Sequence, residues 1–121
     1  MRLYLAGPMT GYFRQNRPAF QAEAARLRAL GFDVVSPDEL NPEGACSDWL
    51  ACMRVDIKHA VDCDGVALLD GWEQSRGAPI EEALMRGLGL RVFRAKHLVG
   101  LAGSMPVLSG EVLEPQQMVV A

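Results

Sequence analysis

The chain has 121 residues, of which 50% are hydrophobic and 22% are charged. This length suits one domain with one core, and this composition is typical of a globular protein rather than of a disordered chain. The 12 basic and 15 acidic residues give a net charge of −3 and include no basic run, which argues against broad electrostatic binding to polymeric nucleic acid. No stretch approaches the roughly 18 consecutive apolar residues of a membrane span, and no signal-peptide pattern opens the chain. We therefore expect a cytoplasmic protein with no membrane partner.

The cysteines and histidines do not predict a metal site. Cys46, Cys52 and Cys63 lack the CxxC spacing of a redox pair or a zinc knuckle, and only His59 and His97 could assist them. We expect reduced, partly buried thiols. We predict neither a metal nor an organic cofactor.

The first half of the chain alternates short apolar runs with a helical pattern. Residues 3–6 form an apolar run, which predicts a strand. The spacing of apolar residues over 18–30 predicts a helix, with Asn16 as its N-cap. Residues 32–36 predict a second strand of typical length, and residues 37–45 predict a loop.

The second half continues this alternation. Ser47 can cap a helix whose apolar positions extend from 50 to 61, and the apolar run 66–69 predicts a buried strand. Apolar positions between 80 and 88 predict a third helix, and residues 91–93 predict a fourth strand. The resulting order is strand-helix-strand-helix-strand-helix-strand.

This order predicts the fold class. Short, nearly all-apolar strands that alternate with helices favour a parallel sheet covered on both faces, because parallel strands need crossover connections. We expect a Rossmann-like α/β fold with three α/β/α layers and a mostly parallel sheet of four or five strands. We assign the domain to residues 1–98. Residues 99–121 are less regular, and they could add an edge strand, contact a second subunit or remain mobile.

The loops that follow the predicted strands are the candidate site, because ligands bind outside the carboxyl ends of the strands in an open α/β sheet. These loops cover residues 7–16, 37–47 and 70–77. The first loop contains a hydroxyl group and glycines, which let the backbone approach a ligand closely. It is neither a GxGxxG fingerprint nor a Walker loop, so a plain turn is an equally good interpretation. Its candidate binding residues are Gly7, Pro8, Met9, Thr10 and Gly11.

The third loop leads directly into a helix through Ser75, Arg76 and Gly77. The first turn of this helix contains Glu81 and Glu82, and acids there commonly stabilise a helix without any other role. A carboxylate at this point also lies on the ligand side of the sheet, where the helix dipole favours the ionised form that a nucleophile needs. The residues alone leave open which of the two glutamates would act.

Three further residues are candidates for the same crevice. Asp56 lies in the second predicted helix, where an exposed acid is the simplest interpretation, but it would pair with Glu81 if that helix covers the crevice. Tyr4, in the first strand, fits the core, where its hydroxyl would need a partner. Trp72 is placed to cover a flat ring near the site, and a packing role fits it equally well.

Three pieces of sequence combine into a recognisable pattern. They are the run from Tyr4 to Pro8, the placement of Asp56 eight residues before Asp64, and the motif Ser75-x-Gly77-Ala78-x-x-Glu81. In this order they resemble the nucleoside 2-deoxyribosyltransferase-like superfamily, and in particular its small uncharacterised bacterial and phage branch. The resemblance covers roughly residues 2–94.

The resemblance implies a domain that acts on the N-glycosidic bond of a nucleoside or nucleotide and that assembles as a homodimer or higher homo-oligomer. The family's nucleophilic glutamate, which attacks the anomeric carbon, matches Glu81. Its helix aspartate matches Asp56, which is thereby implied to handle the proton at the base. Its first-strand tyrosine matches Tyr4, which is implied to hold the nucleophile in place. A small-molecule nucleoside or nucleotide is the implied partner.

Ser75 bears on the substrate. Transferases of free nucleosides tend to carry an acid at this place, whereas the similar 2′-deoxynucleoside 5′-monophosphate N-hydrolases carry serine. A hydroxyl beside the amides of a helix N-terminus can bind a phosphate, which a carboxylate would repel. We therefore favour a nucleoside 5′-monophosphate, in deoxy form, with Thr10, Gly11, Ser75, Arg76 and Gly77 as phosphate contacts.

The sequence also departs from this pattern and leaves alternatives open. The basic residue that the monophosphate hydrolases carry in the first loop is absent, unless Arg14 or Arg17 replaces it. Hydrolysis and transfer to a second base remain equally compatible with the motif. A non-catalytic nucleotide-binding sensor or scavenger is the alternative function, because the same loops and helix N-terminus would serve binding alone.

Overall fold

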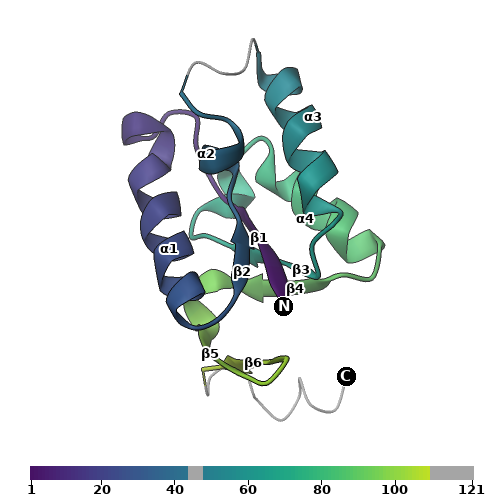
Figure 1. The fold of residues 1–121 in the computed structure, drawn as a ribbon. Coiled ribbons are helices and arrows are strands. Elements are labelled where there is room, and N and C mark those ends of the chain that lie inside the picture. The colour runs from purple at the N-terminus through teal and green to yellow at the C-terminus, as the bar shows by residue number, and fades with distance from the viewer. Residues whose placement is uncertain (44–47, 110–121) are drawn as a thin grey trace.

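The computed structural model describes residues 1–43 and 48–109, which fold into a parallel sheet between helices. The sheet has four strands in the order β2-β1-β3-β4, and every pair is parallel. Helix α1 lies on one face of this sheet, and α3 and α4 lie on the other (Figure 1). The predicted α/β fold class is thereby confirmed. The strands are β1 (Arg2–Ala6), β2 (Asp33–Val35), β3 (Gly65–Leu68) and β4 (Arg91–Arg94), and the long helices are α1 (Arg17–Ala29), α3 (Trp49–Ala60) and α4 (Ala78–Gly87).

The alternation of side chains along β1 builds two cores. Leu3 and Leu5 point to the face that α1 covers, where they join a cluster with Phe20 and Leu27. The residues between them point to the opposite face. Tyr4 and Ala6 there join the cluster that includes Ala78 and Met85 of α4. Because both faces are covered, no residue of β1 or β3 other than Arg2 carries a charge, and the residues of both strands are buried apart from Arg2.

The strand order creates a crevice beside β1. The chain runs from β1 to β2 in one direction and from β3 to β4 in the other, so the connections after β1 and β3 diverge at the carboxyl end of the sheet. In open α/β sheets such a switch in direction is where ligands bind. The first predicted loop follows β1, and the third predicted loop, which includes the 3-10 helix η2 (Trp72–Gln74), follows β3.

The ends of the helices differ from the sequence prediction at two places. Asn16 occupies the N-cap position of α1, but its side chain donates to the carbonyl oxygen of Pro8 (2.9 Å) instead of capping the helix. Asp48, not Ser47, caps α3 and accepts a hydrogen bond from the amide of Ala51 at 2.8 Å. Ser47 itself lies outside the described residues.

Two short helices lie where loops were predicted. Helix α2 (Pro37–Leu40) is a single turn that begins at a proline, whose fixed φ suits the first position of a helix. The 3-10 helix η1 (Phe13–Asn16) contains three consecutive residues with left-handed backbone, since Arg14, Gln15 and Asn16 have φ values of 49°, 55° and 61°. This unusual turn carries the chain from the first loop into α1.

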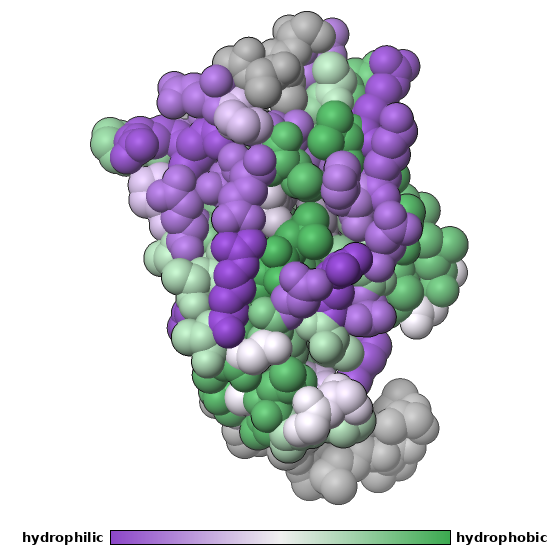
Figure 2. All heavy atoms as spheres, in the orientation of Figure 1, coloured by the Kyte–Doolittle hydropathy of each residue, from purple (hydrophilic) through white to green (hydrophobic). Residues whose placement is uncertain are grey.

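Residues 98–108 form an antiparallel hairpin that is separate from the four-stranded sheet. It consists of β5 (Leu98–Ala102) and β6 (Met105–Leu108), preceded by the 3-10 helix η3 (Ala95–His97). The Arg26 guanidinium ties it to α1 by donating to the carbonyl oxygens of Ala95 and Leu98, each at 2.8 Å. The lower part of the surface in Figure 2 is mostly hydrophobic or neutral, and the hairpin's large exposed apolar residues are Val99, Met105 and Val107. Residues 110–121 lie outside the described part of the chain.

The helices bear on the membrane prediction in one respect. Across residues 1–43 and 48–109, no helix has both the length and the apolar character that crossing a bilayer would require.

Candidate active site

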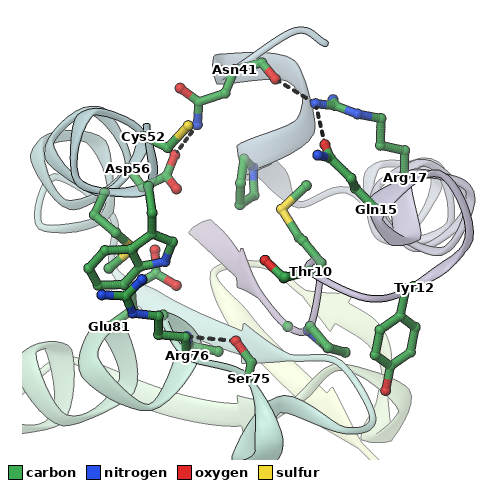
Figure 3. A pocket seen from close by; sticks show the side chains of 18 of the residues that line it. Thr10, Tyr12, Gln15, Arg17, Asn41, Cys52, Asp56, Ser75, Arg76 and Glu81 are labelled. Carbon is green, nitrogen blue, oxygen red and sulfur yellow. Dashed lines mark hydrogen bonds between the residues drawn. The ribbon is translucent and has the colours of Figure 1, made fainter. Parts of the chain in front are cut away.

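A cavity of about 630 Å³ opens at the carboxyl ends of β1 and β3. Its walls are the loop after β1, the region around α2, one face of α3 and the loop that enters α4 (Figure 3). Most of the predicted site residues line this cavity. They are Gly7, Pro8, Met9, Thr10, Asp56, Ser75, Arg76, Gly77 and Glu81. Gly11 and Trp72 are not among the lining residues, and Tyr4 lies beneath the cavity, fully buried.

Glu81 and Tyr4 form the buried base of the site. The first turn of α4 directs Glu81 toward β1, and the Tyr4 hydroxyl donates to Glu81 Oε2 at 2.5 Å. Glu81 is only 5% exposed, and this burial raises the pKa of its carboxyl to about 8. The Tyr4 hydrogen bond lowers this pKa, and the nearby charge of Asp56 raises it. Burial is the largest of these effects, so the pKa of Glu81 lies well above the ordinary value of a glutamate.

Asp56 is the second carboxyl of the site and lies on α3. It is 7% exposed, and its Oδ1 accepts a hydrogen bond from the Asn41 amide at 2.5 Å. Burial raises the pKa of Asp56 to about 6, although the Asn41 hydrogen bond and His59 lower it. Asp56 is therefore a buried residue of the cavity, not an exposed helix acid. The two carboxyls have pKa values displaced to either side of neutrality, which is an arrangement suited to acid and base roles.

Arg17 is a buried cation on the opposite wall. It donates to the backbone oxygens of Asp38 (3.0 Å) and Asn41 (2.9 Å) and to the Gln15 side chain (3.3 Å). Its Nε has no hydrogen-bond partner in the described part of the chain, and no described carboxylate pairs with it within 4.0 Å. Of the two arginines considered from the sequence, Arg17 lines the cavity and Arg14 does not. The cavity thus contains a positive charge without a carboxylate counter-ion among the described residues.

Two glycines allow close packing around the cavity. A Cβ on Gly7 would lie 2.8 Å from Leu69 Cβ, and a Cβ on Gly77 would lie 2.9 Å from the Met53 sulfur. Beside Gly77, the Ser75 hydroxyl oxygen accepts a hydrogen bond from the Ala78 amide at 3.1 Å, which leaves its O–H free to donate. The chain before α4 therefore presents backbone and hydroxyl groups to a ligand.

Trp49, which the sequence analysis missed, is the tryptophan that lines the cavity. The Arg76 guanidinium lies over its indole, 3.8 Å from the ring centroid. Trp72 instead packs against the core cluster on the α4 side of the sheet. The spacing of Trp49, Met53 and Asp56, at i, i+4 and i+7, could have placed this tryptophan on the same helix face as the aspartate.

The neighbouring glutamate, Glu82, does not line the cavity. Glu82 points away from the cavity and pairs with Arg86 on the next turn (3.0 Å), so Glu81 is the glutamate of this helix that faces the site.

Across the described ranges, no three His, Cys, Asp or Glu side chains are grouped to hold a metal ion. The prediction of reduced thiols is correct for Cys63, which is free and buried, and wrong for Cys52, which is disulfide-bonded. Cys46 lies outside the described residues.

Comparison with known proteins agrees with the resemblance at the level of the superfamily. A solved structure of a 2-deoxyribosyltransferase from the psychrotolerant bacterium Bacillus psychrosaccharolyticus, described as a biocatalyst for nucleoside synthesis, is similar with a TM-score of 0.57. Its sequence is 28% identical, and the match covers 76% of this chain and 69% of that one. Among curated proteins, no significant match is found. The domain of unknown function DUF4406 matches residues 1–94, and the chain therefore belongs to the DUF4406 family.

Proposed function

We propose that this protein breaks the N-glycosidic bond of a deoxynucleoside 5′-monophosphate by nucleophilic attack of Glu81. The observation that carries the proposal is the buried pair of Glu81 and Tyr4, which shares one cavity with the second carboxyl, Asp56. The similarity to a 2-deoxyribosyltransferase supports glycosyl chemistry as the reaction class. The cavity is also of a size that suits a small organic ligand.

The reaction would proceed as a double displacement. A Glu81 carboxylate oxygen attacks the anomeric carbon, the bond from that carbon to the base nitrogen breaks, and the base leaves with the bonding electrons. A proton from Asp56 neutralises the leaving base. Water, or the nitrogen of a second base, then attacks the anomeric carbon of the glycosyl ester. Asp56 takes up the proton from that nucleophile, and Glu81 is released as a carboxylate.

The two pKa values describe how the site is prepared for this reaction. Between about pH 6 and pH 8 the pair of carboxyls carries one proton. The reactive arrangement has this proton on Asp56 and leaves Glu81 ionised, held by the Tyr4 hydroxyl. The reaction therefore requires the shared proton to lie on Asp56.

Three features support a 5′-monophosphate. Ser75 offers a hydroxyl donor at the start of α4, where a carboxylate would repel a phosphate. Arg76 is a cation at the edge of the cavity. Arg17 is a buried cation with no carboxylate paired to it among residues 1–43 and 48–109, and a buried charge favours an anionic partner.

One observation favours a second candidate, a nucleotide sensor or scavenger without turnover. With a pKa of about 8, the Glu81 carboxyl holds a proton in most molecules at neutral pH, and a protonated carboxyl can bind but cannot attack. This candidate and the first share the cavity and differ in whether base is released.

The test is base release from a panel of nucleosides and their 5′-monophosphates, in ribo and deoxy forms, with and without a free acceptor base, followed by chromatography. We expect release from deoxynucleoside monophosphates that is lost in Glu81→Ala and kept in the matched variant Glu82→Ala. Exchange of base without net release would identify a transferase. Bound nucleotide recovered intact after long incubation would identify the sensor, and loss of activity in Glu82→Ala alone would contradict the assignment of the nucleophile.

A further inference from the structure

The Arg76 side chain covers the indole of Trp49. The guanidinium carbon lies 3.8 Å from the ring centroid. Both residues line the cavity, Trp49 from the first turn of α3. Arg76 reaches it from the loop before α4 (Figure 3). No carboxylate of the described residues pairs with Arg76 within 4.0 Å. The ring is therefore the contact that holds this cation in the described structure.

This stack and a bound base compete for the same surface. A separation of 3.8 Å is van der Waals contact, so no ring fits between the guanidinium and the indole. A nucleobase can stack on this indole face only after Arg76 has moved. An aromatic ring that lines a cavity is otherwise a good platform for a base, because every base has a flat π-face.

An anion at the start of α4 would supply the force that moves Arg76. Its two neighbours, Ser75 and Gly77, also line the cavity, and the Ser75 O–H is free to donate. A phosphate bound there would offer the guanidinium charge-assisted hydrogen bonds, which are stronger than its contact with the half-buried ring of Trp49. Arg76 is exposed, so the side chain has room to turn.

We propose that Arg76 is a phosphate-responsive gate on Trp49 and thereby determines the preference for nucleotides over nucleosides. Without a phosphate the guanidinium occupies the indole, and a 5′-phosphate withdraws it and frees the ring for the base. This inference rests on the proposed function, because it takes a nucleoside 5′-monophosphate as the ligand. It requires phosphate and base to bind with positive coupling, each strengthening the other by the same factor.

Fluorescence of Trp49 measures the gate directly. The chain has two tryptophans, so Trp72→Phe leaves Trp49 as the reporter. In this background, inorganic phosphate alone should change the emission, and the change should vanish in Arg76→Ala. Arg76→Ala should bind 2′-deoxyadenosine about two- to fivefold more tightly, since the ring is already free, and 2′-deoxyadenosine 5′-monophosphate about tenfold more weakly.

Two further variants separate the stack from the charge. Arg76→Lys keeps a cation but loses the planar group that stacks on the ring, so it should bind the nucleoside with an affinity between those of wild type and Arg76→Ala while retaining most of the monophosphate affinity. Arg54→Ala removes an exposed arginine of α3 that does not line the cavity, and it should leave both affinities unchanged.

Specific outcomes overturn the gate. One such outcome is Trp49 fluorescence that does not change when inorganic phosphate is added. Another is an Arg76→Ala variant that binds 2′-deoxyadenosine and its 5′-monophosphate more weakly by the same factor. Either result would show that Arg76 is an ordinary binding residue. The titrations read binding and not turnover. Base release without any change of selectivity in Arg76→Ala would therefore refute the gate alone, whereas the expected binding pattern without base release would refute the proposed reaction alone.

Discussion

Glu81 makes the stability of the fold depend on pH. Burial raises the pKa of its carboxyl from 4.5 to about 8, so between these values the folded protein holds a proton that the unfolded chain has released. Unfolding then releases this proton, and the free energy of unfolding falls as pH rises. The stabilising contribution is complete below about pH 4.5 and is lost as pH passes about 8.

Between about pH 6 and pH 8, the change in the free energy of unfolding comes from Glu81. The pKa of Asp56 is raised only to about 6, so the change above that pH belongs to Glu81. About two pH units at ~1.4 kcal/mol each give a loss of about 2–3 kcal/mol in the wild type between about pH 6 and pH 8. Glu81→Gln has no proton to release and keeps an oxygen acceptor for the Tyr4 hydroxyl, so its stability should stay level there.

Urea unfolding followed by circular dichroism, at steps from about pH 6 to pH 9, tests this reasoning. The advantage of Glu81→Gln over wild type should grow by about 2–3 kcal/mol across the range. Glu82→Gln is the matched control, because it removes only an ion pair with the exposed Arg86, worth about 0.3–0.5 kcal/mol. If the free energy of unfolding changed with pH in the same way in Glu81→Gln and in the wild type, the buried carboxyl would not hold its proton in this range.

The other predictions concern catalysis, base binding and a backbone contact. The pH profile of kcat/KM for base release should be bell-shaped, with limbs near pH 6 and pH 8. Asp56→Asn should lower the maximum of this profile by about 10²–10⁴ and abolish its alkaline limb. An unchanged profile in Asp56→Asn would show that Asp56 takes no part in the mechanism. Trp49→Ala should raise the KM for the nucleotide by about tenfold, because the base loses the ring on which it stacks. An equal rise in Trp72→Phe would contradict the assignment of Trp49 as the stacking residue. In thermal unfolding Gly7→Ala should cost about 1–3 kcal/mol, because its Cβ would lie 2.8 Å from a neighbouring side-chain carbon. Gly87→Ala, whose Cβ would meet nothing within 4 Å, should cost nothing, and similar losses in both would refute the steric argument.

The sheet was predictable because its signals are local. Residues 3–6 and 66–69 are apolar without interruption, as strands buried on both faces must be, and both segments lie in the core. The helix α2 was not predictable in the same way. Its four residues make one turn, which is too short for any repeat of apolar positions, and its proline fits a loop equally well.

The site was predictable only where position along the chain determines position in the fold. Glu81 and Ser75 follow a strand, so their side of the sheet was known in advance. Asn41 reaches Asp56 only through the placement of α2, and Arg17 reaches Asn41 only through the angle at which α1 begins. Contacts of this kind join residues that are 15 and 24 positions apart, and no spacing rule connects them.

The left-handed turn of η1 has a consequence for how this sequence can drift. Left-handed backbone costs a residue with a side chain roughly 1–2 kcal/mol, a cost that glycine does not incur. Glycine at position 15 or 16 would also remove a contact, since Gln15 bonds to Arg17 and Asn16 bonds to Pro8. For the Arg14 side chain no such contact is seen in the ranges 1–43 and 48–109. Substitution by glycine at position 14 would therefore relieve left-handed backbone without removing a side-chain contact seen in the described ranges, whereas glycine at position 15 or 16 would remove one.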